Sequence, residues 1–171
     1  MDFLKLAKDR YSVRSFKPDM ITDDELCAIL EAGRVAPTAR NFQPQKIFVA
    51  KSEESRKKLA SVCRFTFDAP VVLVIGYDKE RSWKNKLMQG HDIGETDAAI
   101  VTTHMMLMAA SIGIGSCYVG YFSSDEVKKA LGLPESVVVT ALLPLGYPSE
   151  SSIPASFHTE LREKADTIEE I

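Results

Sequence analysis

The stretch AAIVTTHMMLMAASIGIGSCYVGYFSS, residues 98–124, contains no aspartate, glutamate, lysine or arginine. Its length is that of a membrane-spanning helix, which needs about 20 predominantly apolar residues. Threonine, histidine and serine interrupt the stretch, however, and Gly113 and Gly115 divide it in two. A helix at 95–112 that is buried on all sides, followed by a turn and a buried strand at 115–122, explains the pattern better than a membrane span.

Helix and strand signals alternate on either side of this stretch. Thr22 and Glu25 have the spacing of a capping box, and Ser123 and Glu126 repeat it, so each pair predicts the start of a helix. The continuous apolar run at 69–78 predicts a central strand. This alternation is typical of mixed folds of helices and strands. The expected helices cover 3–10, 24–36, 52–63, 95–112 and 126–133, and the expected strands 45–50, 69–78, 115–122 and 136–148.

Composition limits the class of protein. The 171 residues are 45% hydrophobic and 26% charged with a net charge of -3, which predicts a single domain with a substantial core. The acidic balance gives no reason to expect a nucleic-acid partner. The N-terminal segment lacks the basic start and apolar run of a signal peptide. Cys27, Cys63 and Cys117 have no zinc spacing, so we expect reduced thiols, no metal site and a cytoplasmic location.

The segment RYSVRSF, residues 10–16, places Arg10, Ser12 and Arg14 at alternate positions. In an extended segment these three side chains point the same way. Arginine forks match phosphate oxygens, and a serine hydroxyl adds a donor. The pattern is therefore compatible with a phosphate clamp, although a solvated connector gives the same sequence.

The segment APTARNFQPQ, residues 36–45, predicts a rigid loop because prolines restrict its backbone on both sides. Such a loop presents amide and hydroxyl groups that suit the polar edge of a planar heterocycle. The alternative is an ordinary turn whose side chains satisfy nearby backbone groups. Known nucleotide motifs are absent: Tyr118 stands where GxGxxG needs its third glycine, and there is no GxxxxGK sequence. The polar side chains of the loop are Thr38, Arg40, Asn41, Gln43 and Gln45.

Four stretches together resemble the FMN-dependent nitroreductases in their compact form. They are the Arg-x-Ser-x-Arg segment at 10–16, the Pro-Thr-x-x-Asn-x-Gln-Pro loop within 36–49, the apolar helix and strand at 97–122, and LLPLGYP at 142–148. The resemblance implies an α+β fold: a three-layer αβα sandwich with a mixed, mainly antiparallel sheet, forming an intertwined homodimer. Residues 1–171 would form one FMN-binding domain, with the polar extension 149–171 wrapping the partner subunit.

The resemblance also implies which residues bind FMN. Arg10, Ser12 and Arg14 would hold the phosphate and ribityl end. Arg162 and Lys164 are placed on the phosphate by charge spacing alone. The residues expected along the isoalloxazine ring are Pro37, Thr38, Ala39 and Asn41, across the dimer interface, and Tyr118, Val119, Gly120, Leu145 and Gly146 on the other side.

The implied activity is an oxidoreductase in which NADH or NADPH reduces FMN, and FMN passes electrons to a nitroaromatic, quinone or similar small acceptor. The cofactor carries this chemistry, so no catalytic side chain is assigned. His104 is expected to be a hydrogen-bonded core residue. The alternatives are flavin reduction or reductive dehalogenation on the same scaffold, a flavin-binding sensor or store without turnover, and a dimer without FMN. Residues 79–94 are expected to form a loop that could cover the substrate pocket.

Overall fold

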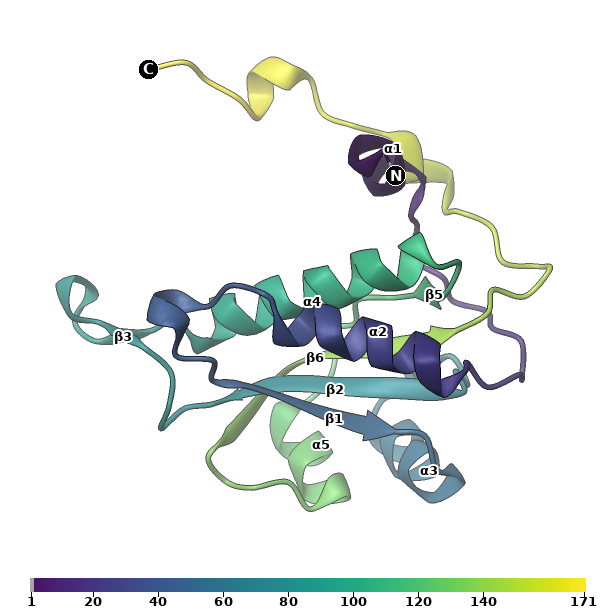
Figure 1. Cartoon of the computed structure of the whole chain (residues 1–171), viewed down its shortest axis with the longest axis horizontal. Helices are drawn as coiled ribbons and strands as arrows, with labels where there is room; N and C mark the ends of the chain where they lie inside the picture. The colour runs from purple at the N-terminus through teal and green to yellow at the C-terminus, as the bar shows by residue number, and fades with distance from the viewer. Residues whose placement is uncertain (1) are drawn as a thin grey trace.

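The computed structural model describes residues 2–171, and a four-stranded sheet runs through its centre (Figure 1). Its strands are β1 (Gln45–Ala50), β2 (Val71–Asp78), β5 (Gly115–Ser116) and β6 (Val137–Gly146), in the spatial order β1-β2-β6-β5. All three neighbouring pairs are antiparallel, and a single parallel bridge joins Ser12 to Ser116. The expectation of a mixed, mainly antiparallel sheet is confirmed.

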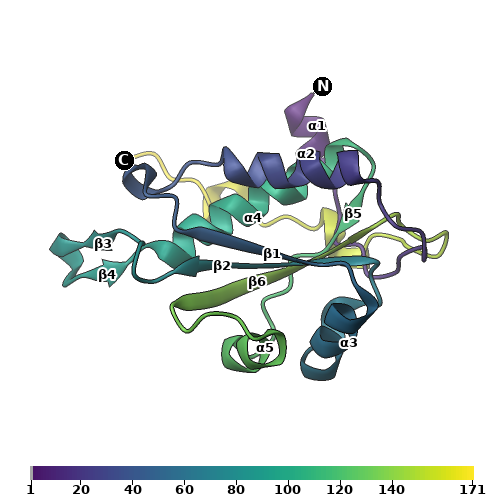
Figure 2. The ribbon, with the colours of Figure 1, turned by 60° about the horizontal axis from the view of Figure 1, so that its bottom comes forward.

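Helices cover both faces of this sheet (Figure 2). On one face lie α2 (Asp23–Arg34) and the long α4 (Gly94–Ser111), with α1 (Phe3–Asp9) beyond the end of α4. On the other face lie α3 (Glu53–Val62) and α5 (Ser124–Leu131). The three-layer αβα arrangement expected from the sequence is therefore confirmed.

Strand β2 joins the two cores because its side chains alternate between the faces. Leu73 and Ile75 pack in the core beneath α2 and α4, whereas Val72 and Val74 pack in the core beneath α3 and α5. The strand lies between β1 and β6 and is buried along almost its whole length. The expectation of a central strand at 69–78 is confirmed.

The helix starts follow their capping signals. Thr22 and Glu25 form a complete capping box, and the Ser123 side chain accepts a hydrogen bond from the backbone N–H of Glu126. Helix α2 stops at Arg34, before Pro37. Val35, which follows the last residue of the helix, is 61% exposed.

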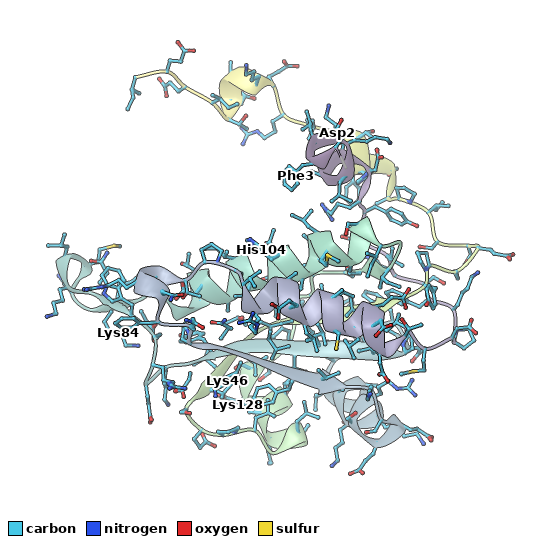
Figure 3. All side chains as sticks on the ribbon, viewed as in Figure 1. Asp2, Phe3, Lys46, Lys84, His104 and Lys128 are labelled. Atoms are coloured by element: carbon cyan, nitrogen blue, oxygen red, sulfur yellow. The ribbon has the colours of Figure 1, made fainter. Side chains whose placement is uncertain are left out.

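Helix α4 is buried on one side only. Ala98, Val101 and Met105 face the core, whereas His104 is half-buried, and Figure 3 shows it on the side turned away from the sheet. Its Nδ1 atom bonds the carbonyl of Ile100 at 2.9 Å. The expectation of a helix buried on all sides is therefore wrong for one chain. His104 is hydrogen-bonded as expected, but it does not lie in the core of this chain.

Two other segments also differ from their expectations. The strand expected at 115–122 pairs with β6 only at Gly115–Ser116, followed by an isolated bridge at Val119, because the next residues leave the sheet edge toward α5. Residues 79–94 are not a plain loop: strands β3 (Lys84–Asn85) and β4 (His91–Asp92) form a small hairpin around the turn Lys86–Met88. In the part of the chain that the structure describes, no helix is long and apolar enough to cross a membrane.

The chain after β6 has little regular structure. It forms two short 3-10 turns, at Ser156–Thr159 and Lys164–Asp166. The first turn passes α1, and the second lies beyond it, away from the sheet (Figure 1).

Candidate functional site

Arg10, Ser12 and Arg14, called here the Arg10 cluster, lie on the extended segment that pairs with Ser116 of β5, the residue before Cys117. Burial raises the pKa of the Cys117 thiol, and the positive charges of Arg14 and Arg10 and a hydrogen bond with Ser12 oppose that rise. Arg14 donates from Nη1 to the Ser12 carbonyl at 3.3 Å. Among residues 2–171, no carboxylate forms a salt bridge with Arg10 or Arg14. The structure thus places the two arginines and the serine on one short extended segment, with no acidic partner for either arginine among the described residues.

Backbone pairing with β5 fixes the geometry of this cluster. The N–H of Val13 donates to the carbonyl of Ser116 at 2.9 Å, and the Val13 side chain is buried against Gly115. A Cβ atom on Gly115 would lie 2.8 Å from Val13, so glycine allows the two segments to approach. Because neighbouring side chains in an extended segment point to opposite sides, burying Val13 turns Ser12 and Arg14 the other way.

The loop between α2 and β1 is folded tightly on itself. It contains the 3-10 turn Ala39–Asn41, and Arg40, Asn41 and Gln43 have positive φ angles of 52°, 57° and 50°. Such left-handed residues cost about 1–2 kcal/mol each, although less for asparagine. The N–H of Gln43 donates to Thr38 Oγ1 at 3.0 Å, and its side-chain Nε2 donates to Asn41 Oδ1 at 3.2 Å. The loop is therefore a defined, strained structure rather than a mobile turn.

The cluster and the loop lie at opposite ends of α4. Ala39 is hydrogen-bonded to Asp97 near the start of this helix, whereas Arg10 contacts Met106 near its end. At a rise of about 1.5 Å per residue, the nine steps from Asp97 to Met106 span about 14 Å. The two predicted parts of the site are therefore not brought together within one chain.

The predicted ring-side residues differ in accessibility. Tyr118 is 39% exposed, and burial together with the negative charge of Glu95 raises the pKa of its hydroxyl. Gly120 is open, since a Cβ atom there would meet nothing within 4 Å. Val119 is buried and bridges β6, and Leu145 and Gly146 are buried inside the sheet. Leu145 and Gly146 pair with Ser116 and Gly115 of β5, so they support the sheet edge rather than present an open surface.

A pocket of about 560 Å³ adjoins Gly120 and was not anticipated from the sequence. Phe65 and Tyr121 line it with their ring centroids 5.7 Å apart in an edge-to-face arrangement, and the Arg64 guanidinium lies 4.8 Å from the Phe65 ring centroid. Cys63 Sγ approaches the Tyr121 carbonyl at 3.9 Å. The sequence feature that could have indicated this pocket is the pair of aromatic segments RFTF, residues 64–67, and GYF, residues 120–122. Only the fold brings these two segments together.

The C-terminal residues are divided between two environments. Tyr11 donates to the Ser152 carbonyl at 3.1 Å, and His158 Nε2 bonds the Lys8 carbonyl at 3.1 Å, so this part packs on the N-terminal segment of its own chain. Arg162 instead pairs with Asp166 at 3.9 Å, with its side chain 76% exposed. The turn Lys164–Asp166 lies beyond α1 and away from the sheet (Figure 1).

Comparison with known proteins decides the family. The profile described as "Nitroreductase family" matches residues 7–64 and 63–147. The chain belongs to the nitroreductase family. It is 32% identical over 156 residues to a putative NADH dehydrogenase/NAD(P)H nitroreductase of Archaeoglobus fulgidus, with 86% of each chain covered. The crystal structure of a nitroreductase family protein from Clostridium difficile superposes with a TM-score of 0.92 at 31% identity, covering 99% of this chain and 98% of that one. A Bacillus subtilis relative named NAD(P)H FMN reductase is 25% identical over 168 residues, which is 88% of this chain and 68% of the relative.

The nitroreductase family match covers the Arg10 cluster, the loop at 37–43 and the residues around Gly120. It ends at residue 147, so the tail lies outside the matched region. Arg162 and Lys164 consequently have neither a contact with the cluster nor a family match to support them, and their role stays a prediction.

Proposed function

We propose that this member of the nitroreductase family is an FMN-dependent oxidoreductase that takes electrons from NADH or NADPH and passes them to a small acceptor, such as a nitroaromatic or a quinone. One observation carries the proposal: Arg10, Ser12 and Arg14 stand at alternate positions of the extended segment beside β5, and among residues 2–171 no carboxylate pairs with either arginine. Two uncompensated guanidiniums and a hydroxyl match the dianionic phosphate of a flavin mononucleotide.

The remaining residues also fit this cofactor. A planar ring can lie directly against the backbone only where no side chain intervenes. Gly120 has no side chain, and the space that a Cβ atom would occupy there is open. The loop around Asn41 presents polar groups in a fixed geometry, which suits the hydrogen-bonding edge of the ring. Leu145 and Gly146 are buried and pair with β5, so their role is to hold the strand that precedes Tyr118.

A homodimer would complete the site. In one chain the cluster and the loop are about 14 Å apart along α4, and the outer side of α4 carries the half-buried Ile100, His104 and Leu107. Phe3 on α1 and Leu161 in the tail are exposed apolar side chains. A second copy packed on α4 would cover these groups and bring its own loop toward the cluster, with residues 149–171 reaching across to the partner.

The chain's own residues bind and orient, whereas FMN, when bound, supplies the electron transfer. The guanidiniums of Arg10 and Arg14 would neutralise the charge of the FMN phosphate, and Asn41 would hydrogen-bond the polar edge of the isoalloxazine ring. The pocket next to Gly120 offers a planar acceptor or a nicotinamide an aromatic wall, in which the Phe65 and Tyr121 rings stand edge to face and Arg64 lies over the Phe65 ring. The side chains at the site thus do not need to supply an acid or a base.

Steady-state turnover tests the proposal. Purified protein is expected to be yellow, to contain FMN, and to oxidise NADH or NADPH faster when nitroaromatics or quinones are added. Flavin content without NAD(P)H oxidation would instead indicate a sensor or store, and a colourless dimer that binds no added FMN would contradict the proposal. Flavins and halogenated aromatics belong in the same acceptor panel, because they distinguish the other reactions of this scaffold.

A further inference from the structure

Asp97 connects α4 to the loop at 37–43 in a way that the proposed function does not yet explain. It lies in the first turn of α4, is 1% exposed, and is the only buried acidic or basic residue among residues 2–171. Its Oδ1 atom accepts a hydrogen bond from the backbone N–H of Ala39 at 2.8 Å. This bond joins two residues that are 58 positions apart in the sequence.

Burying this carboxylate is costly for folding. Its Oδ2 atom is buried and has no hydrogen-bond partner in the described chain. Burial raises the pKa of Asp97, a rise that the bond from Ala39 opposes and the charge of Asp92 reinforces. An apolar side chain would fill the same space without the desolvation cost. The stability of the core therefore gives no reason for a carboxylate at this position.

The geometry of the loop supplies a reason. Two hydrogen bonds tie the loop to regular structure: Ala39 N–H to Asp97 on one side, and Asp78 N–H to the Pro44 carbonyl, at 2.9 Å, on the other. The left-handed residues Arg40, Asn41 and Gln43 lie between these two points. Releasing one point would allow the strained residues to relax to ordinary backbone angles.

We infer that Asp97 is a positioning residue that holds the loop at 37–43 in its strained conformation, so that Asn41 is already oriented when FMN binds. The inference rests on the proposed function, in which this loop contacts the flavin ring. Holding the loop in advance removes the ordering cost from the binding step, which strengthens binding.

Four variants separate this role from a general effect on stability. Asp97→Ala removes the acceptor, whereas Asp97→Asn keeps an oxygen that can accept from Ala39. Ala39→Pro removes the donor from the other side and suits the first position of a helical turn. Asp24→Asn is the matched control, since Asp24 is an exposed carboxylate in the first turn of α2.

Amide hydrogen exchange of residues 37–43 is measured on the purified protein before and after flavin removal, together with FMN affinity by titration. We expect Asp97→Ala and Ala39→Pro to speed exchange in this loop and to weaken FMN binding about ten- to a hundredfold. Asp97→Asn should restore most of both properties, and Asp24→Asn should change neither. Because the two damaging changes remove the same bond, adding Asp97→Ala to Ala39→Pro should have little further effect.

The inference would be overturned if amide exchange of residues 37–43 were the same in Asp97→Ala as in the parent. If Asp97→Ala does not fold, the same comparison is made with Ala39→Pro. Faster exchange with unchanged FMN affinity would also overturn it, because the anchored loop would then not serve the flavin. A parent protein that binds no FMN would refute the proposed function instead, while the exchange measurement would still decide whether Asp97 fixes the loop.

Discussion

The hydroxyl of Tyr147 donates a 2.8 Å hydrogen bond to Oε2 of Glu25, linking the residue after β6 to the capping box of α2. The same oxygen accepts from the backbone N–H and the hydroxyl of Thr22, at 2.7 and 2.8 Å. One carboxylate oxygen thus caps a helix and anchors the segment that leaves the central sheet.

This relationship predicts a pH-dependent contribution to stability. The bonds from the Thr22 backbone, from Tyr147 and from the Thr22 hydroxyl lower the pKa of Glu25 from its ordinary value of 4.5. A lowered folded-state pKa means that the stabilisation is present above pH 4.5 and is lost as the pH falls through the folded-state value. We expect Tyr147→Phe to lower the midpoint of urea unfolding at pH 7, with the difference from the parent shrinking below about pH 4. A pH-independent difference would show that the Glu25 charge is not involved.

The phosphate clamp is tested at Arg14. Arg14→Ala should weaken FMN binding by about 1.5–3 kcal/mol, because a charge-assisted contact with the phosphate is lost. Riboflavin has no phosphate and should bind parent and variant equally. Arg34→Ala removes an exposed arginine that pairs with Glu31 on α2, and it should leave FMN binding unchanged. Equal loss of FMN and riboflavin affinity would place Arg14 elsewhere than at the phosphate.

The open backbone at Gly120 gives a second prediction about the cofactor. A methyl group there meets nothing within 4 Å, so Gly120→Ala should leave the flavin-free protein as stable as the parent or slightly more so. If a flavin ring approaches this backbone, the same methyl group should lower FMN affinity. Thermal unfolding and flavin titration of one preparation measure both properties. Undiminished affinity would show that the ring does not approach Gly120.

Gly76→Ala is the contrasting variant, because its Cβ would lie 2.2 Å from the Val138 carbonyl oxygen. It should destabilise the fold by at least about 1–3 kcal/mol, because the backbones of β2 and β6 would have to separate. Equal stability of the two alanine variants would contradict the close approach of β2 and β6 at Gly76.

The tail gives the last prediction. Deleting residues 160–171 keeps the contacts of Ser152 and His158 with their own chain but removes Arg162 and Lys164. If this part reaches the partner's cofactor, the truncated protein should contain less FMN and dissociate at higher concentrations than the parent. Deleting only 167–171 retains both basic residues and should preserve the FMN content. Light scattering with flavin absorbance decides; a fully yellow dimer without residues 160–171 would show that the segment is dispensable for both.

The sequence by itself determined most of the secondary structure. The capping box at Thr22 and the apolar run that forms β2 depend on neighbouring residues, so their spacing predicts them without a tertiary structure. Arg10, Ser12 and Arg14 were also identifiable, since side chains two apart in an extended segment share one side. The end of strand β5 at Ser116 could not be predicted in the same way. It depends on where the chain leaves the edge of the sheet, which only the tertiary structure sets.

Only the tertiary structure decided how distant residues combine. In the sequence, Asp97 looks like any acidic residue in the first turn of a helix. Its burial and its hydrogen bond with Ala39 depend on how α4 packs beside the loop at 37–43. Phe65 and Tyr121 form one pocket because α3 and α5 lie side by side on the same face. Local spacing fixes which way neighbouring side chains point, whereas contacts between residues more than fifty positions apart are set by the packing of whole elements.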